Sequence, residues 1–185
     1  MTLIAYHKRK IYGDSLNVGI DPNDNEMNIG QITYKNKIFT DSGVRIAIGS
    51  SGSLYSKKDR DTVASGVLSA VVALEDETLE FHAKGMIELP FGLQTSLPPR
   101  TIVLSAKNAY KIKFKDSYFL QAIDDDDGPI FYGSSEQLAN MIFAHTGCML
   151  KTFSKVFEFD QAVGGTIYVG GCENLNPIQK LKGAK

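Results

Sequence analysis

The 185-residue chain contains no tryptophan, only two cysteines and only three histidines. Two cysteines, Cys148 and Cys172, are too few for a disulfide-rich secreted scaffold, and the histidines follow no zinc-site spacing. No apolar run approaches the roughly 18 residues of a membrane-spanning helix, and the first residues lack the pattern of a secretion signal. We therefore expect reduced thiols, a cytoplasmic location, no membrane segment and no zinc centre.

The chain also lacks an excess of charge of either sign. Its 20 lysines and arginines against 21 acidic residues give a formal net charge of -1, so no overall field draws it to nucleic acid or to a membrane. The small basic clusters at 7–10 and 57–60 have no interleaved aromatics, and we interpret them as a hairpin tip and a helix start. The hydrophobic fraction of 43% is ordinary for a globular protein. The length predicts one domain over 1–185.

Several short motifs imitate functional sites but miss a required position. The loop DPNDNE at 21–26 resembles the start of a calcium-binding EF-hand loop, yet Glu26 stands where glycine is required. The stretch GSSG at 49–52 is followed by Ser53, so it is not the G-x-S-x-G nucleophile elbow. The acidic run at 124–127 is typical of a solvated turn. There is no phosphate-binding loop or dinucleotide motif, and we expect neither a metal nor an organic cofactor.

Hydrophobic periodicity predicts strands and helices in separate runs, which is typical of α+β folds. Prolines at 90, 98 and 99 argue against a long second helix between 80 and 100. The expected order is a hairpin over 2–18 with its tip at 7–10, strands at 31–39 and 44–49, a helix at 58–74, a strand meander over 101–123, a short strand at 129–132, helices at 136–145 and 149–157, and a strand at 166–169.

The start of the chain combines two groups that can act together in acyl transfer. If Met1 is removed, Thr2 carries a free amine close to its own hydroxyl. An α-amine has a reference pKa of about 7.7 to 8.0, so part of it is free base near neutral pH. One residue then supplies both nucleophile and base. Such a site further needs a cation, a carboxylate that holds the cation, and backbone N–H groups for the oxyanion.

Six short motifs along the chain supply residues of these kinds. They are MTLIAY with Thr2, YGDSL with Asp14, KNKIF with Lys37, AIGSSGS with Gly52, FYGSSEQLA with Ser134, and DQAVGG with Asp160. In this order they resemble the motifs of proteasome-type β-subunits, which belong to the N-terminal nucleophile hydrolases. The resemblance is strongest to the simpler bacterial and phage versions related to the peptidase of the two-component ATP-dependent protease. It covers the chain from end to end.

The resemblance implies a role for each residue of the first hairpin and the strand that follows. Thr2 would attack the scissile carbonyl, and its amine would take and return the proton. Lys37, held by Asp14, would lower the pKa of the nucleophile. Taken alone, Lys37 could equally be one exposed strand lysine, and Asp14 could simply belong to a turn.

The resemblance also implies roles for three residues further along. The N–H of Gly52 would stabilise the oxyanion, while Asp160 and Ser134 would orient the amine. Ser134 could instead only cap the helix that follows it, Asp160 could be a helix-end acid, and Gly52 a helix-start glycine. The sequence departs from the family at Val163, where a serine is usual, and at Leu16, where many members have arginine.

The implied fold is a four-layer αββα sandwich of two antiparallel sheets with a shortened second helix. The implied function is that of a threonine-type N-terminal nucleophile amidohydrolase, a peptidase that cleaves unfolded polypeptides. The resemblance further implies a cytoplasmic homo-oligomer, with an AAA+ unfolding ATPase as a partner. Two alternatives stay open: a catalytically silent structural or assembly protein of the same fold, virion-associated if phage-encoded, and an amidase for a small amide.

Overall fold

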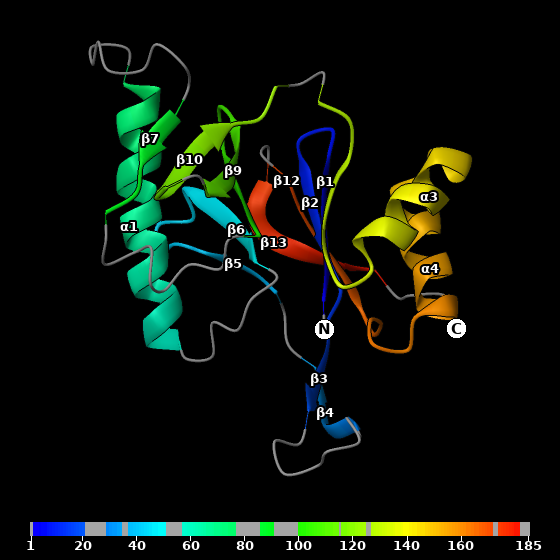
Figure 1. The fold of residues 1–185 in the computed structure, drawn as a ribbon. Coiled ribbons are helices and arrows are strands. Elements are labelled where there is room, and N and C mark those ends of the chain that lie inside the picture. The colour runs from blue at the N-terminus through cyan, green and yellow to red at the C-terminus, as the bar shows by residue number, and fades with distance from the viewer. Residues whose placement is uncertain are drawn as a thin grey trace.

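The structure is a computed structural model that describes residues 2–20, 29–34, 37–50, 57–76, 86–90, 100–114, 116–124, 127–171 and 174–181. Two antiparallel sheets lie face to face between helix α1 (Lys57–Glu75) on one side and helices α3 (Glu136–Thr146) and α4 (Met149–Phe159) on the other (Figure 1). This arrangement confirms the predicted α+β class and four layers. Among the described residues, no helix is long and apolar enough to cross a membrane.

The first sheet is built around the hairpin at the start of the chain. Its strands, in spatial order, are β11 (Ile130–Gly133), β1 (Leu3–His7), β2 (Lys10–Gly13), β12 (Ile167–Gly171) and β13 (Asn174–Leu181). The predicted basic tip is a two-residue turn at Lys8 and Arg9, both with positive φ, as such tight hairpins require. Arg9 donates hydrogen bonds to the carbonyls of Ala106 and Lys107, at 3.1 and 2.7 Å, which fixes the strained tip.

The second sheet faces α1. Its strands, in spatial order, are β5 (Ile38–Thr40), β6 (Ile46–Ser50), β8 (Thr101–Ser105), β9 (Ala109–Phe114), β10 (Tyr118–Ala122) and β7 (Met86–Glu88). The predicted strand meander after residue 100 is confirmed as β8, β9 and β10. The predicted shortened second helix falls mostly outside the described residues, and the described part of that region forms strand β7.

Two strands that the sequence predicts as continuous are each broken. Residues 11–18 divide into β2 and β3 (Leu16–Ile20), and residues 31–39 divide into β4 (Ile29–Tyr34) and β5. The first break occurs because the N–H groups of Ser15 and Leu16 bind the carbonyl of Gly164 instead of continuing the ladder. Among the strands that the structure describes, β3 and β4 pair only with each other, and they form a ribbon that extends away from the sandwich (Figure 1).

Strand β1 shows how one strand serves two layers of the core. Ile4 and Tyr6 pack between the two sheets, whereas Leu3 and Ala5 pack under α3 and α4. Successive side chains of a strand point to opposite faces, so this alternation places β1 in the interior of the sandwich. All four of these side chains are buried. Thr2, the residue before them, therefore lies at the start of a strand whose side chains are packed on both faces.

The packing of α4 on the first sheet yields a stability prediction. Phe153 is fully buried and contacts the rings of Tyr12 and Phe157. We expect Phe153→Ala to lower the free energy of unfolding by about 3–5 kcal/mol, because it removes a core aromatic and leaves a cavity. Phe159→Ala, at an exposed position on the same helix, should change it by less than about 0.5 kcal/mol. Urea unfolding followed by circular dichroism measures both, and equal losses would contradict this packing.

Candidate active site

The beginning of β1 is held by the end of β11. Thr2 is buried, and its carbonyl accepts a hydrogen bond of 3.2 Å from the N–H of Ser134. Gly133 lies opposite Leu3 with φ at 131°. A Cβ on Gly133 would lie 1.7 Å from the carbonyl oxygen of Thr2. Only glycine therefore allows the two backbones to approach this closely.

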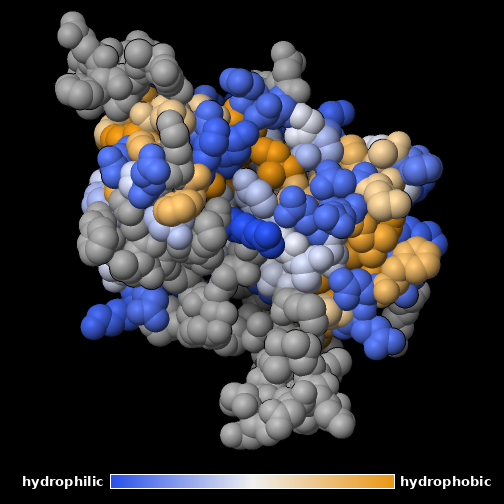
Figure 2. Space-filling view, in the orientation of Figure 1, coloured by the Kyte–Doolittle hydropathy of each residue, from blue (hydrophilic) through white to orange (hydrophobic). Residues whose placement is uncertain are grey.

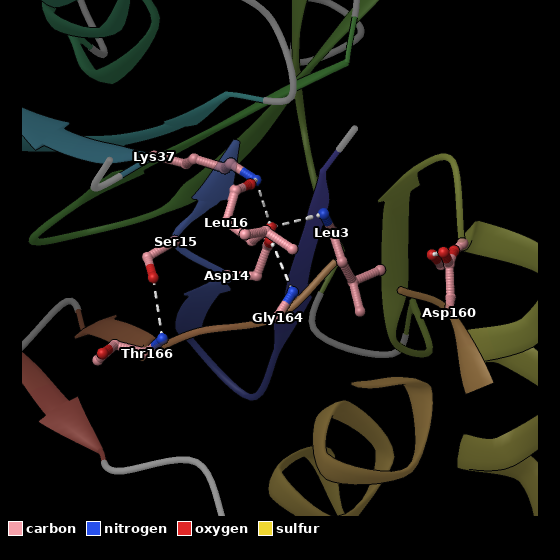
Figure 3. Close-up of polar contacts among 9 residues, drawn as sticks. Leu3, Asp14, Ser15, Leu16, Lys37, Asp160, Gly164 and Thr166 are labelled. Carbon is pink, nitrogen blue, oxygen red and sulfur yellow. Dashed lines mark hydrogen bonds and ion pairs between the residues drawn. The ribbon is translucent and has the colours of Figure 1, made fainter. Parts of the chain in front are cut away.

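Asp14 lies at the end of β2, next to the first residues of β1. Its carboxylate is fully buried. Oδ1 accepts the N–H of Leu3 at 2.8 Å, and Oδ2 accepts the N–H of Gly164 at 3.3 Å (Figure 3). The N–H of Asp14 in turn donates to the carbonyl of Leu3 at 3.1 Å. Asp14 is thus hydrogen-bonded to Leu3, the residue that directly follows Thr2.

Lys37 comes directly before β5 and reaches back to Asp14. Its Nζ lies 2.6 Å from Asp14 Oδ1 and 2.6 Å from the carbonyl oxygen of Leu16 (Figure 3). Its side chain is only 8% exposed, so both members of the ion pair are removed from water. A charge in such a place needs both a counter-ion and further hydrogen bonds, and Lys37 has both.

Burial shifts the proton affinities of both partners. It lowers the pKa of Lys37, and the charge of Asp14 opposes this shift. Burial raises the pKa of Asp14, and Lys37 together with the N–H groups of Leu3 and Gly164 opposes it. A lysine with a lowered pKa releases its proton more easily than an exposed lysine does, which suits a group that takes part in proton transfer.

Asp160 forms a second polar cluster, at the end of α4. Its Oδ2 accepts a hydrogen bond from the hydroxyl of Ser135, and its Oδ1 accepts the N–H of Ala162 at 2.9 Å. Ser135 is buried and directly precedes α3, whereas the side chain of Ser134 is exposed. The sequence predicts that Ser134 and Asp160 orient the Thr2 amine, and it misses Ser135, whose hydroxyl binds the Asp160 carboxylate. The adjacent serines in FYGSSEQLA were the available signal.

The predicted site residues therefore fall into three groups. Asp14 and Lys37 are in direct contact beside the start of β1, and the backbone of Ser134 holds Thr2. Asp160 joins the same region through Ser135, the next residue. Gly52 lies outside the described residues. Within those ranges, no group of three or more histidine, cysteine and acidic side chains is placed to hold a metal ion.

Val163 lies beside this site, and its side chain packs against apolar neighbours. It is buried in the cluster that includes Leu3, Phe153 and Ile167. The next residue, Gly164, donates its N–H to Asp14. The DQAVGG segment thus contributes backbone rather than a side-chain hydroxyl at this point of the site.

The close approach of Gly133 to Thr2 predicts a sharp contrast between two glycines. We expect Gly133→Ala to unfold the protein or to lower its free energy of unfolding by more than about 3 kcal/mol, because the new Cβ would overlap the Thr2 carbonyl. Gly128→Ala is the control, since a Cβ there meets nothing within 4 Å. Thermal unfolding compares the two variants. Equal stability would show that β1 and β11 do not approach each other in this way.

Because the ion pair is buried, removing one partner should destabilise the fold more than replacing both partners. Lys37→Met should lower the free energy of unfolding by about 3–5 kcal/mol, because it leaves the Asp14 carboxylate buried without its cation. The double variant Asp14→Asn, Lys37→Met should lose much less, since asparagine keeps an acceptor for the Leu3 N–H and carries no charge. Lys155→Met, which breaks the exposed pair with Glu158, should cost less than about 1 kcal/mol.

The loss in Lys37→Met should also depend on pH. Lys37 is the cation that opposes the burial that raises the pKa of Asp14, so its removal should raise that pKa further. A carboxyl whose folded pKa is raised favours the folded state at low pH, and this advantage disappears as the pH rises through that pKa. Urea unfolding at several pH values should therefore show the smallest loss under acidic conditions. A loss that grows towards acidic pH would contradict the buried ion pair.

No known family model and no curated protein matches the sequence of this chain. Solved structures do match its fold. HslV from Trypanosoma brucei aligns over 91% of this chain and 96% of its own, with a TM-score of 0.54 and 14% identity. Anbu, an ancestral β-subunit from Yersinia bercovieri, aligns over 98% and 88%, with a TM-score of 0.56 and 12% identity.

A third match is the Anbu complex from Pseudomonas aeruginosa, described as a helical assembly. It aligns over 98% of this chain and 86% of its own, with a TM-score of 0.51 and 13% identity. Similarity at this level of identity shows a shared fold and leaves the activity to be argued from the site. HslV and Anbu are proteasome-type proteins. The chain therefore has a proteasome-like fold.

Proposed function

We propose that the chain is a threonine-type N-terminal nucleophile hydrolase, a peptidase that acts on unfolded polypeptides after Met1 is removed. The observation that carries this proposal is the buried contact between Lys37 and Asp14, whose carboxylate also binds the N–H of Leu3. This contact places a cation and its counter-ion beside the residue that follows Thr2. The fold, which HslV and Anbu share, supports the same reading.

In the proposed reaction, the hydroxyl oxygen of Thr2 attacks the carbonyl carbon of the scissile bond. The free amine of Thr2 takes the hydroxyl proton and gives it to the leaving amine, so that an ester to Thr2 forms and the peptide bond breaks. Water then hydrolyses the ester. Lys37 lowers the pKa of the hydroxyl by its positive charge and by a proton that it releases easily. The N–H of Gly52 stabilises the oxyanion.

Asp160 has a supporting role in this proposal. Its carboxylate is bonded to Ser135, while the adjacent Ser134 donates its N–H to the Thr2 carbonyl. Two neighbouring residues thus join the acid to the chain start, and we propose that this link orients the amine of Thr2.

We further propose that the protein is a homo-oligomer and works with an AAA+ ATPase that unfolds its substrates. The P. aeruginosa neighbour is described as a helical assembly. In this chain Met141, Leu150 and Phe159 expose apolar side chains on α3 and α4, and hydrophobic surface gathers on that side of the molecule (Figure 2). We propose that the chain forms one domain over 1–185 and that it self-associates in the cytoplasm of a bacterial or phage-infected cell.

One observation favours a second candidate function. Val163 fills an apolar cluster where the resemblance leads one to expect a serine that binds the terminal amine. A protein that keeps the fold for assembly, including a virion component, needs no such serine. The second candidate is therefore a catalytically silent structural or assembly protein.

The peptide bond between Met1 and Thr2 decides between these functions. We expect the intact mass of protein made in a bacterial host to lack one methionine. A peptide epoxyketone should then label it, because this probe reacts with both the amine and the hydroxyl of an N-terminal threonine. Mass spectrometry of the labelled protein should place the adduct on Thr2, and Thr2→Ala should not be labelled.

Two further variants make the outcome specific. Thr2→Ser keeps a hydroxyl and should still be labelled, whereas Lys37→Gln should be labelled at least about a hundredfold more slowly, because the nucleophile loses its neighbouring cation. Retention of Met1 after confirmed exposure to methionine aminopeptidase, or equal labelling of wild type and Thr2→Ala, would refute the enzyme and favour the silent protein.

A further inference from the structure

The segment after Asp14 is bonded to the glycine turn near the end of the chain. Ser15 is buried, and its Oγ accepts the N–H of Thr166 at 2.9 Å (Figure 3). The N–H groups of Ser15 and Leu16 both donate to the carbonyl of Gly164, at 3.2 and 3.0 Å. Three hydrogen bonds therefore join two short segments that are about 150 residues apart in the sequence.

These hydrogen bonds lie next to two further contacts of the ion pair, one made by Asp14 and one by Lys37. Gly164 returns its N–H to Asp14 Oδ2, and Leu16 offers its carbonyl to Lys37 Nζ (Figure 3). The turn itself is glycine-rich, and Gly165 has φ at 80°. Because glycine restricts the backbone least, such a turn keeps one geometry only where other groups hold it. The hydroxyl of Ser15 binds the N–H of Thr166 on the far side of this turn.

We propose that Ser15 is a positioning residue for the Asp14–Lys37 pair. Its hydroxyl holds Thr166, and thereby keeps the N–H of Gly164 on the carboxylate of Asp14. This inference rests on the proposed function and deepens it, since it adds a side chain that acts on the reaction through Asp14. Ser15 itself contacts neither the nucleophile nor the substrate.

A residue that only stabilises the fold would give a different result from one that positions Asp14. Loss of a merely structural hydrogen bond lowers the free energy of unfolding but leaves the proton affinity of Asp14 unchanged. Loss of a positioning bond removes the Gly164 N–H from the charged carboxylate and so favours the protonated form. The groups that face Asp14 are the ammonium of Lys37 and the N–H groups of Leu3 and Gly164.

The test compares Ser15→Ala with a matched loss of a buried hydroxyl elsewhere. Thr152 in α4 is fully buried and bonds to Cys148 and Thr146, so Thr152→Val is the control. Carboxyl carbon NMR follows the titration of Asp14 in each protein, with its signal assigned from Asp14→Asn. We expect the midpoint to rise by about one pH unit in Ser15→Ala. Thr152→Val should leave it where it is in the wild type.

Kinetics provide a second readout on the enzyme. We expect Ser15→Ala to lower kcat by about tenfold with KM unchanged, because substrate binding is not touched. An unchanged Asp14 midpoint in Ser15→Ala, or an equal shift in Thr152→Val, would overturn the proposal. If Ser15→Ala fails to fold, Ser15→Cys replaces the hydroxyl with a slightly larger thiol, which is a weaker acceptor, and undergoes the same titration.

The two proposals fail in distinguishable ways. If wild-type Thr2 is not labelled by the epoxyketone, the proposed function is wrong, and the NMR titration still measures whether Ser15 positions Asp14. If Thr2 is labelled and the titration does not respond to Ser15→Ala, only the role of Ser15 is wrong.

Discussion

Burying the two charges of the Asp14–Lys37 ion pair costs free energy, and hydrogen bonds from the surrounding backbone offset this cost. Taking each ion out of water costs several kcal/mol, which their mutual attraction offsets only when the remaining donors and acceptors are also satisfied. Here the N–H groups of Leu3 and Gly164 bind the carboxylate, and the carbonyl of Leu16 binds the ammonium. A buried ion pair compensated in this way adds little net stability to the fold.

The sandwich makes this compensation available because its first sheet brings distant segments together. β2 lies between β1 and β12, so the end of β2 has the chain start on one side and the glycine turn before β12 on the other. Asp14 sits at that point and takes one donor from each neighbour. The ladder stops there because the next two N–H groups turn to Gly164. The end of β2 therefore carries a buried polar centre instead of simply passing into a loop.

Periodicity predicted the helices at 58–74, 136–145 and 149–157 and most strands, because these depend on local patterns that a packed sandwich preserves. The four layers were implied by the resemblance of the ordered motifs. Two strand breaks were missed: the bonds that end β2 come from Gly164, far along the chain, and nothing local announces them. For the same reason the sequence did not reveal Ser135, because two adjacent serines precede the helix and only packing decides which hydroxyl reaches Asp160. The acid and the lysine were recognisable through the resemblance of their motifs, YGDSL and KNKIF, since each residue taken alone had an ordinary structural explanation.

The ribbon of β3 and β4 begins at Leu16, two residues after Asp14, and ends at Tyr34, three residues before Lys37 (Figure 1). Both of its ends are fixed in the sandwich, one by Gly164 and the other by the bonds of Lys37. The entropy of closing a loop grows only slowly with its length, by about 0.6 kcal/mol per doubling. Insertions or deletions within the ribbon can therefore accumulate during evolution without separating the two charges at its base. The length of chain between the acid and the lysine can vary while the contact between them is kept.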